Sequence, residues 1–209
     1  RGLGDVYKRQ KKMLAVLVSV AMCGAAFAGC GNNADSSKAE SKAESSSSQV
    51  EKMPETDEEW TQAMYDKAMV SYGNTSMMQN VIKKAQSGEK VTVAYLGGSI
   101  TEGISAGADG CYAKLTYDYF AQKFGTGDNV QYVNAGLSGT PSKLGILRLD
   151  RDVLAYEPDI CFIEFAVNDG TETDYQNAYE SIVRTLLQKN ITPVLLFSVT
   201  ENDHSAQDY

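Results

Sequence analysis

Short apolar runs alternate with longer amphipathic segments through the second half of this 209-residue chain, and this alternation limits its fold more than any other feature. The apolar runs, each of strand length, are Val91–Leu96, Val130–Ala135, Asp159–Val167 and Ile191–Val199. The segments between them carry apolar residues at helical spacing and are Cys111–Phe124, Ser142–Tyr156 and Thr173–Asn190. Strands that alternate with helices predict βαβ units and a parallel sheet.

The four predicted strands are almost continuously apolar, which is typical of a sheet covered by helices on both faces. We therefore expect a three-layer α/β/α fold, with two further helices, Glu58–Ser71 and Asn74–Ser87, before the first strand. Parallel sheets bind their ligands at the carboxyl ends of the strands. The loops after these strands should therefore share one edge of the sheet, and we look for chemistry there.

The N-terminal region has the pattern of a bacterial lipoprotein signal. Two lysines precede an apolar run of 16 residues, Met13–Ala28, which suits a signal-peptide core but is shorter than the roughly 20 residues of a membrane span. The run leads into Phe27-Ala28-Gly29-Cys30, which resembles a lipobox, although Phe27 stands where Leu is usual. We expect cleavage before Cys30 and acylation of its thiol, which would anchor the exported protein at the outer face of the cell membrane. The alternative is an ordinary signal peptide in which Cys30 is incidental.

The sequence divides into four parts. Residues 1–10 (RGLGDVYKRQ) have no structural pattern and resemble translated adapter sequence, so we take them as a non-native leader. Residues 11–29 are the predicted signal peptide, and residues 30–55 are a Ser-, Lys- and Glu-rich tether that we expect to be disordered. Residues 56–209 form the predicted domain. Because the chain stops after a strand-like run and a polar loop, we expect the fold to be incomplete there and to continue beyond Tyr209.

Charge and cysteine content exclude several functional classes. The chain has 19 basic and 27 acidic residues, which argues against a nucleic-acid partner because such binding depends on neutralising phosphates. Four Cys and a single His argue against a zinc site, and we expect no cofactor and no metal. Cys111 and Cys161 lie outside the signal and could pair in an oxidising compartment. Cys161 sits within an apolar run, which favours a buried free thiol instead.

A glycine-rich loop follows the first predicted strand and reads Gly97-Gly98-Ser99-Ile100-Thr101-Glu102-Gly103. It is not a P-loop, because Ile104 stands where Lys must reach the phosphates. Ser99 interrupts the dinucleotide fingerprint, and Thr101 replaces the last Gly of the α/β-hydrolase elbow. What remains is a serine at a strand-to-helix junction, where a nucleophile can generate an oxyanion beside helix N–H groups. A simple N-cap serine is the structural alternative.

Two later loops add to this reading. The second strand is followed by a loop within Asn134–Ser142 (NAGLSGTPS), and the third by a loop within Phe165–Gly170 (FAVNDG). Together with the loop around Ser99, they resemble in order and spacing the first three blocks of the SGNH (GDSL-type) hydrolases, a family of esterases and acyl hydrolases with a flavodoxin-like fold. The resemblance covers about residues 91–200.

By position, the resemblance implies that Ser99 is the nucleophile. It also implies that the Gly139 N–H and the Asn168 side-chain amide belong to the oxyanion hole, with Gly136 as the less favoured glycine. The structural alternatives are a turn before Pro141 for Gly139 and a helix cap for Asn168.

The sequence departs from the family pattern at two places. Gly98 replaces the common Asp before the nucleophile, which leaves the serine itself intact. The Asp-x-x-His block that supplies the general base is not recognisable. The only histidine, His204, follows the fourth strand, and we interpret it as a surface-loop residue rather than the base. We expect the true Asp and His beyond Tyr209, so that the present sequence by itself would lack the base and be inactive.

Three acidic residues, Asp169, Glu172 and Asp174, follow Asn168. They could bind a cation, but acids near a helix start also complement its dipole, and we favour this second explanation. The sequence as a whole predicts an exported serine esterase whose partner is a small-molecule or carbohydrate ester, with O-acyl groups of carbohydrate as the expected substrate. The alternatives are an O-acyltransferase of the same fold and a non-catalytic carbohydrate-binding lipoprotein. The oligomeric state is left open.

Overall fold

The computed structural model describes residues 61–198, which contain a four-stranded parallel sheet. The strands are β1 (Val91–Gly97), β2 (Val130–Gly136), β3 (Ile160–Glu164) and β4 (Thr192–Leu195). Their order across the sheet is β2-β1-β3-β4, and every neighbouring pair is parallel. The predicted leader, signal peptide, tether, lipidation site at Cys30 and His204 lie outside the described residues.

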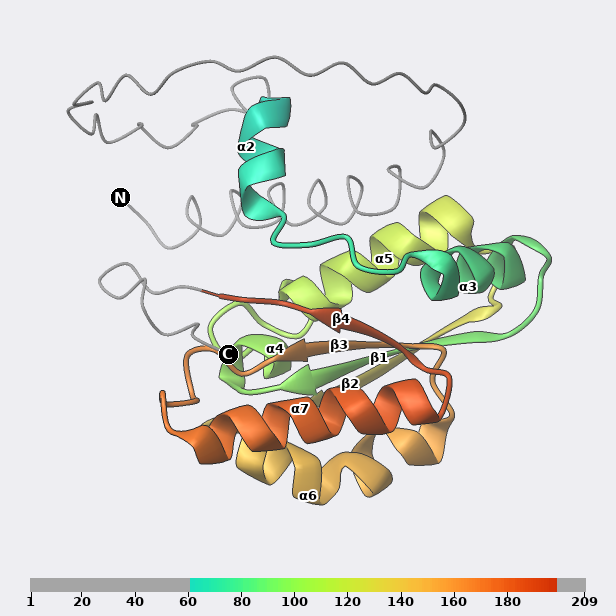
Figure 1. Cartoon of the computed structure of the whole chain (residues 1–209). Coiled ribbons are helices and arrows are strands. Elements are labelled where there is room, and N and C mark those ends of the chain that lie inside the picture. Colours follow the sequence, from blue (N-terminus) through green and yellow to red (C-terminus); the bar gives the residue numbers. More distant parts are fainter. Residues whose placement is uncertain (1–60, 199–209) are drawn as a thin grey trace, which may run out of the picture.

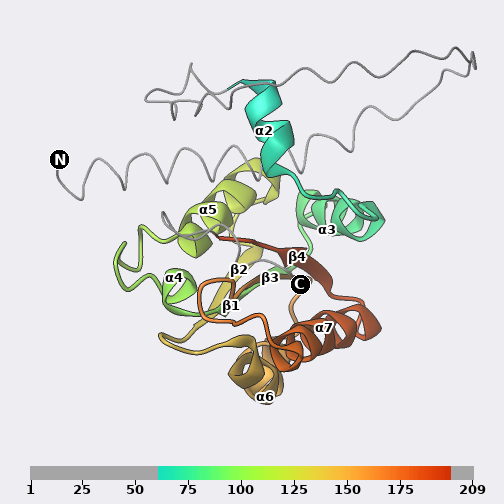
Figure 2. The same cartoon turned by 60° about the vertical axis from the view of Figure 1, so that its left-hand side comes forward.

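Helices cover both faces of the sheet, so the predicted α/β/α layers are present (Figures 1 and 2). The helices are α2 (Gln62–Ala68), α3 (Ser76–Gln86), α4 (Ser99–Glu102), α5 (Tyr112–Phe124), α6 (Ser142–Asp152) and α7 (Thr173–Gln188), with a 3-10 turn, η3 (Leu154–Tyr156), after α6. The α3 and α5 helices lie on one face and α6 and α7 on the other. Within residues 61–198, no helix has the length and apolar character needed to cross a membrane.

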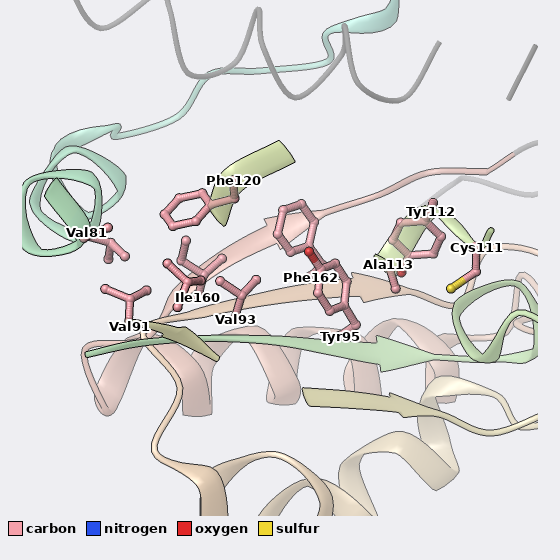
Figure 3. Close-up of a cluster of buried hydrophobic side chains, with 12 residues drawn as sticks. Val81, Val91, Val93, Tyr95, Cys111, Tyr112, Ala113, Phe120, Ile160 and Phe162 are labelled. Carbon is pink, nitrogen blue, oxygen red and sulfur yellow. The ribbon is translucent and has the colours of Figure 1, made fainter. Parts of the chain in front are cut away.

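The β1 strand lies at the centre of the core, and all seven of its residues are buried. Successive side chains of a strand point to opposite faces of the sheet. Val93 and Tyr95 accordingly pack towards α3 and α5, whereas Ala94 and Leu96 pack towards α6 and α7. Figure 3 shows the first of these clusters, in which the Tyr95 and Phe162 rings stack with their centroids 4.8 Å apart.

The chain leaves the sheet in opposite directions after β1 and after β3. From β1 it passes through α5 to β2 at one edge, and from β3 it passes through α7 to β4 at the other edge. Ligands bind at such a switch point in open parallel sheets, outside the carboxyl ends of the strands. Because β1 and β3 are neighbours, the loops that begin at Gly98 and Phe165 flank this switch point.

The third strand is shorter than the run Asp159–Val167 predicts, since β3 ends at Glu164. The backbone N–H groups of Asn168 and Asp169 both donate to the Phe165 carbonyl oxygen, at 2.8 and 2.9 Å. These two bonds turn the chain immediately after the strand, although the sequence there is still apolar. The turn brings Asn168 back towards β1.

Other element ends also differ from the predictions. The helix predicted over Ser142–Tyr156 is divided into α6 and η3, because Val153 leaves the helical conformation with φ near −127°. The helix predicted over Glu58–Ser71 is described only from residue 61 and ends at Ala68. The strand predicted over Ile191–Val199 spans only Thr192–Leu195.

The structure separates Cys111 and Cys161. Both are buried free thiols, and they belong to the clusters on opposite faces of the sheet. Burial raises the pKa of the Cys161 thiol to about 12. The prediction of a buried free thiol at Cys161 is therefore confirmed, and pairing with Cys111 is excluded in this fold.

Candidate active site

Ser99 is the first residue of α4, the single helical turn that follows β1. Gly98 precedes it as the N-cap, and Gly103 ends the turn in the left-handed conformation with φ of 90°. A Cβ atom on Gly97 would lie 2.0 Å from Thr101 Oγ1, so the chain can enter this turn only through a residue without a side chain. Ser99 is partly exposed, and its backbone N–H is one of those that a helix start leaves without a partner inside the helix.

The loop between β2 and α6 carries the two glycines considered for the oxyanion hole. Gly139 is exposed and has φ of 71°, a left-handed conformation that suits glycine. Gly136 ends β2, and its N–H donates to Asn134 Oδ1 at 2.8 Å. Because that hydrogen bond already occupies the Gly136 N–H, Gly139 is the better candidate for an oxyanion donor, as the sequence favoured.

Asn168 reaches from the β3 end to both of the other loops. Its Nδ2 donates to the Thr140 carbonyl oxygen at 3.3 Å, next to Gly139. A Cβ atom on Gly98 would lie only 2.9 Å from the same Nδ2, so the amide also lies against the residue before Ser99. The Asn168 side chain therefore bonds a loop instead of capping a helix. The structure brings all three predicted site residues to one edge of the sheet.

The three acidic residues after Asn168 lie at the amino ends of two different helices. Asp169 is buried, and its Oδ1 accepts the N–H of Ser142, the first residue of α6, at 2.7 Å. Glu172 is the N-cap residue of α7, and Asp174 lies in the first turn of α7. The dipole explanation thus fits these acids, but for Asp169 the helix is α6 rather than the following α7. Within residues 61–198, no group of three or more His, Cys, Asp or Glu is arranged to hold a metal ion.

Arg148 binds the strand ends that carry the site, a role that the sequence analysis did not predict. It is 9% exposed, and its guanidinium donates to the Ala135 and Gly97 carbonyl oxygens at 2.6 and 3.0 Å. It thereby ties the carboxyl end of β2 to that of β1, while its Nε has no partner among the described residues. From the sequence, an arginine in an amphipathic helix is expected to be exposed. The only sequence feature that indicates otherwise is its spacing of three residues from Gly145, which places both residues on the buried face of α6.

Glu164 was also missed, because it lies inside a run that reads as an apolar strand. It is fully buried at the end of β3. The Ser198 hydroxyl donates to its Oε1, and the Thr101 hydroxyl lies 3.5 Å from its Oε2 and 2.8 Å from the Tyr112 hydroxyl. Burial raises the pKa of the Glu164 carboxyl. This group therefore joins α4, α5 and the chain after β4 beneath the site.

A hollow of about 360 Å³ lies at the opposite edge of the sheet, beside the amino ends of the strands. It is lined by Lys84, Glu89, Lys90, Thr92, Tyr156, Glu157 and Asp159. Lys84 Nζ and Asp159 Oδ1 are 2.6 Å apart there and neutralise each other. None of the predicted site residues lines this hollow.

Comparison with known protein families identifies the family to which this arrangement of loops belongs. Residues 95–209 match the GDSL-like Lipase/Acylhydrolase family. The chain belongs to this family. The match covers the three loops described above. None of the curated proteins compared with the chain matches it.

Solved structures with a TM-score above 0.5 agree with the fold of this family. A two-domain esterase (CEX) active on acetylated mannans is 32% identical with a TM-score of 0.63, covering 66% of this chain and 38% of the esterase. The same esterase co-crystallised with mannopentaose is 33% identical with a TM-score of 0.58, covering 64% and 37%. An acetyl xylan esterase, AlAXEase, is 27% identical with a TM-score of 0.43, covering 50% and 57%. This family member thus spans less than two fifths of the mannan esterase it resembles.

Proposed function

We propose that the protein is a serine ester hydrolase in which Ser99 is the nucleophile. The observation that carries the proposal is the convergence of three loops, through which the Asn168 amide lies against Gly98 on one side and bonds the residue after Gly139 on the other. Hydrogen-bond donors fixed in advance around a developing oxyanion lower the barrier to acyl transfer, and losing one typically costs about 3–4 kcal/mol. The N–H groups of Ser99 and Gly139 and the Asn168 amide would supply these donors.

The reaction would proceed through an acyl-enzyme. Ser99 Oγ bonds to the ester carbonyl carbon while its proton passes to a general base. The bond to the alcohol oxygen then breaks, and the alcohol leaves with that proton. Water repeats the two steps on acyl-Ser99 and releases the carboxylic acid. Residues 61–198 contain no histidine, so we propose that the base comes from outside them.

The proposed substrate class is O-acetylated carbohydrate. The esterase active on acetylated mannans is 32% identical to this chain and covers 66% of it. An acetyl group is small, and Ser99 is partly exposed at the carboxyl edge of the sheet. Ser99 could therefore reach an acetyl ester on the surface of a polysaccharide without the site having to enclose the polymer.

The test is hydrolysis by the full-length protein and by its Ser99→Ala variant. We expect release of p-nitrophenol from p-nitrophenyl acetate and of acetate from acetylated mannan. Both should fall by about 10³-fold or more in the variant. Ser105→Ala, in an exposed loop, is the matched control and should retain the activity. Full activity of the Ser99→Ala variant would refute the proposal. Acetyl groups appearing on an added acceptor sugar, with little release into water, would instead indicate an acyltransferase.

We further propose that the protein is exported and anchored through an acylated Cys30. The support is the order of basic residues, apolar run and Cys30 along the sequence, followed by a tether without a core of its own. Labelling of cells with an alkyne fatty acid should mark the protein, and Cys30→Ala should abolish the label. Cys23→Ala, inside the predicted signal peptide, is the control that should leave it. A persistent label in Cys30→Ala would favour an ordinary signal peptide.

A further inference from the structure

One carboxylate of the nucleophile turn holds the loop that carries Gly139. Glu102 Oε2 accepts the backbone N–H of Ser138 at 2.6 Å. Glu102 ends the same helical turn that Ser99 begins, and Ser138 directly precedes Gly139. We infer that Glu102 is a positioning residue that fixes the Gly139 N–H relative to the Ser99 hydroxyl. This inference rests on the proposed function of Ser99 and Gly139.

The turn between Ser99 and Glu102 is rigid enough to transmit a position. The Gly103 N–H donates to the Ser99 carbonyl oxygen at 2.9 Å, and the Glu102 N–H donates to the Gly98 carbonyl oxygen at 3.0 Å. Residues three apart in a helix lie on neighbouring parts of its surface. The hydroxyl of Ser99 and the carboxylate of Glu102 therefore belong to one small unit.

That unit is also pressed against the end of β2. A Cβ atom on Gly136 would lie 2.2 Å from the Glu102 backbone nitrogen, so the two backbones touch. Asn134 Nδ2 donates to the Thr101 carbonyl oxygen at 2.9 Å, and the Leu137 N–H donates to the Gly97 carbonyl oxygen at 3.0 Å. These contacts fix the chain as far as Leu137 but do not reach Ser138 or Gly139.

Beyond Leu137 the loop is a turn that Thr140 closes, with its N–H and its hydroxyl donating to the Leu137 carbonyl oxygen at 3.3 and 2.6 Å. Glu102 holds the middle of this turn, at the Ser138 N–H. Ser138 and Gly139 are both exposed, and a Cβ atom on Gly139 would touch nothing within 4 Å. Within residues 61–198, Glu102 supplies the only side-chain acceptor bonded to the backbone of these two residues. A glycine with φ of 71° changes conformation at little cost, so removing the acceptor would let the peptide between Ser138 and Gly139 tilt within the turn and change the direction of the Gly139 N–H.

The experiment compares Glu102→Ala with Glu102→Gln in the full-length protein, with p-nitrophenyl acetate as substrate. A glutamine keeps an oxygen that accepts the Ser138 N–H and loses only the charge. Glu180→Ala, at an exposed position of α7, is the matched control. Titration of the reactive serine with a phosphonate gives kcat per active site, and thermal unfolding reports the fold.

Glu102→Ala should lower kcat per active site by about 10- to 100-fold with little change in KM, because the misplaced donor acts mainly in the transition state. Glu102→Gln should restore kcat to within about threefold of the unsubstituted protein. A Glu102→Ala protein with unchanged kcat per active site, even if it unfolds at a lower temperature, would overturn the inference. So would equal losses in the Ala and Gln variants. Absence of Ser99-dependent hydrolysis in the unsubstituted protein would instead overturn the proposed function, and the inference with it.

Discussion

At the residue scale, adding a methyl group at Gly98 should lower the activity while leaving the stability of the fold nearly unchanged. A Cβ atom there would come within 2.9 Å of Asn168 Nδ2, the end of a side chain that can move aside. Gly98→Ala should therefore lower kcat/KM by about 10- to 100-fold, since it displaces the Asn168 amide, the proposed oxyanion donor. The free energy of unfolding should change by less than about 1 kcal/mol, because no backbone has to shift.

The double variant with Asn168→Ala tests whether Gly98 acts through that amide. If it does, Gly98→Ala should have almost no further effect on kcat/KM once the amide is gone. Ester hydrolysis and urea unfolding of the four proteins complete the cycle. Fully additive losses would show that Gly98 affects the reaction by another route. The result bears on the family pattern too, because Asp is common at this position and Gly98 leaves the space to Asn168.

At the element scale, α6 packs on the sheet through a glycine. A Cβ atom on Gly145 would lie 2.6 Å from Cζ of Phe165, which is fully buried. Alanine is the better helix former by about 1 kcal/mol, yet the collision should outweigh this gain. We expect Gly145→Ala to lower the free energy of unfolding by about 1–3 kcal/mol, measured with urea.

The control for Gly145 lies on the opposite face of the same helix. Leu147 is 80% exposed, so Leu147→Ala should change the free energy of unfolding by only about 0.5 kcal/mol. A stabilised Gly145→Ala protein would mean that Phe165 can move and that helix propensity decides the outcome at this position.

Periodicity predicted which elements exist but not where several of them end. The apolar run through Val167 reads as strand, yet a tight turn onto the Phe165 carbonyl stops β3 at Glu164. Strand propensity and burial continue past this point, and only the turn geometry, which is not a periodic signal, ends the strand. The division of the predicted helix at Val153 is also a matter of local geometry, because Val153 and Leu154 continue the apolar pattern of the helix while the φ of Val153, near −127°, ends it.

The candidate site divides in a similar way. That Ser99, Gly139 and Asn168 lie at one edge of the sheet could be predicted, because each is in a recognisable motif after a strand; their catalytic roles stay predictions. Glu102 and Arg148 could not, because their roles depend on hydrogen bonds to backbone atoms that are distant in the sequence, at Ser138 and Gly97. The type of a residue and its place in the sequence do not indicate which distant backbone atom its side chain will bond.

At the scale of the whole molecule, the buried carboxyl of Glu164 links stability to pH. Burial raises its pKa in the folded state above the value of about 4.3 that a glutamate has in an unfolded chain. Above that pH the folded protein therefore holds more protons than the unfolded chain, and stability must fall as the pH rises towards the folded-state pKa. The acidic and phenolic groups that face Glu164 are Asp169 after β3, Tyr112 of α5 and Tyr179 of α7, and a second negative charge among them is unfavourable.

Glu164→Gln should remove this contribution, because the amide has a similar shape and does not ionise. Below about pH 4 the two proteins should differ by a constant amount, and above it the free energy of unfolding of the glutamine variant should rise relative to the unsubstituted protein. Urea unfolding at intervals between about pH 3.5 and about pH 8 measures the difference. Glu180→Gln, exposed on α7, should leave the two curves nearly parallel. Parallel curves for Glu164→Gln itself would mean that the carboxyl ionises as readily in the folded protein as in the unfolded chain, and that the network of Thr101 and Ser198 stabilises its charge.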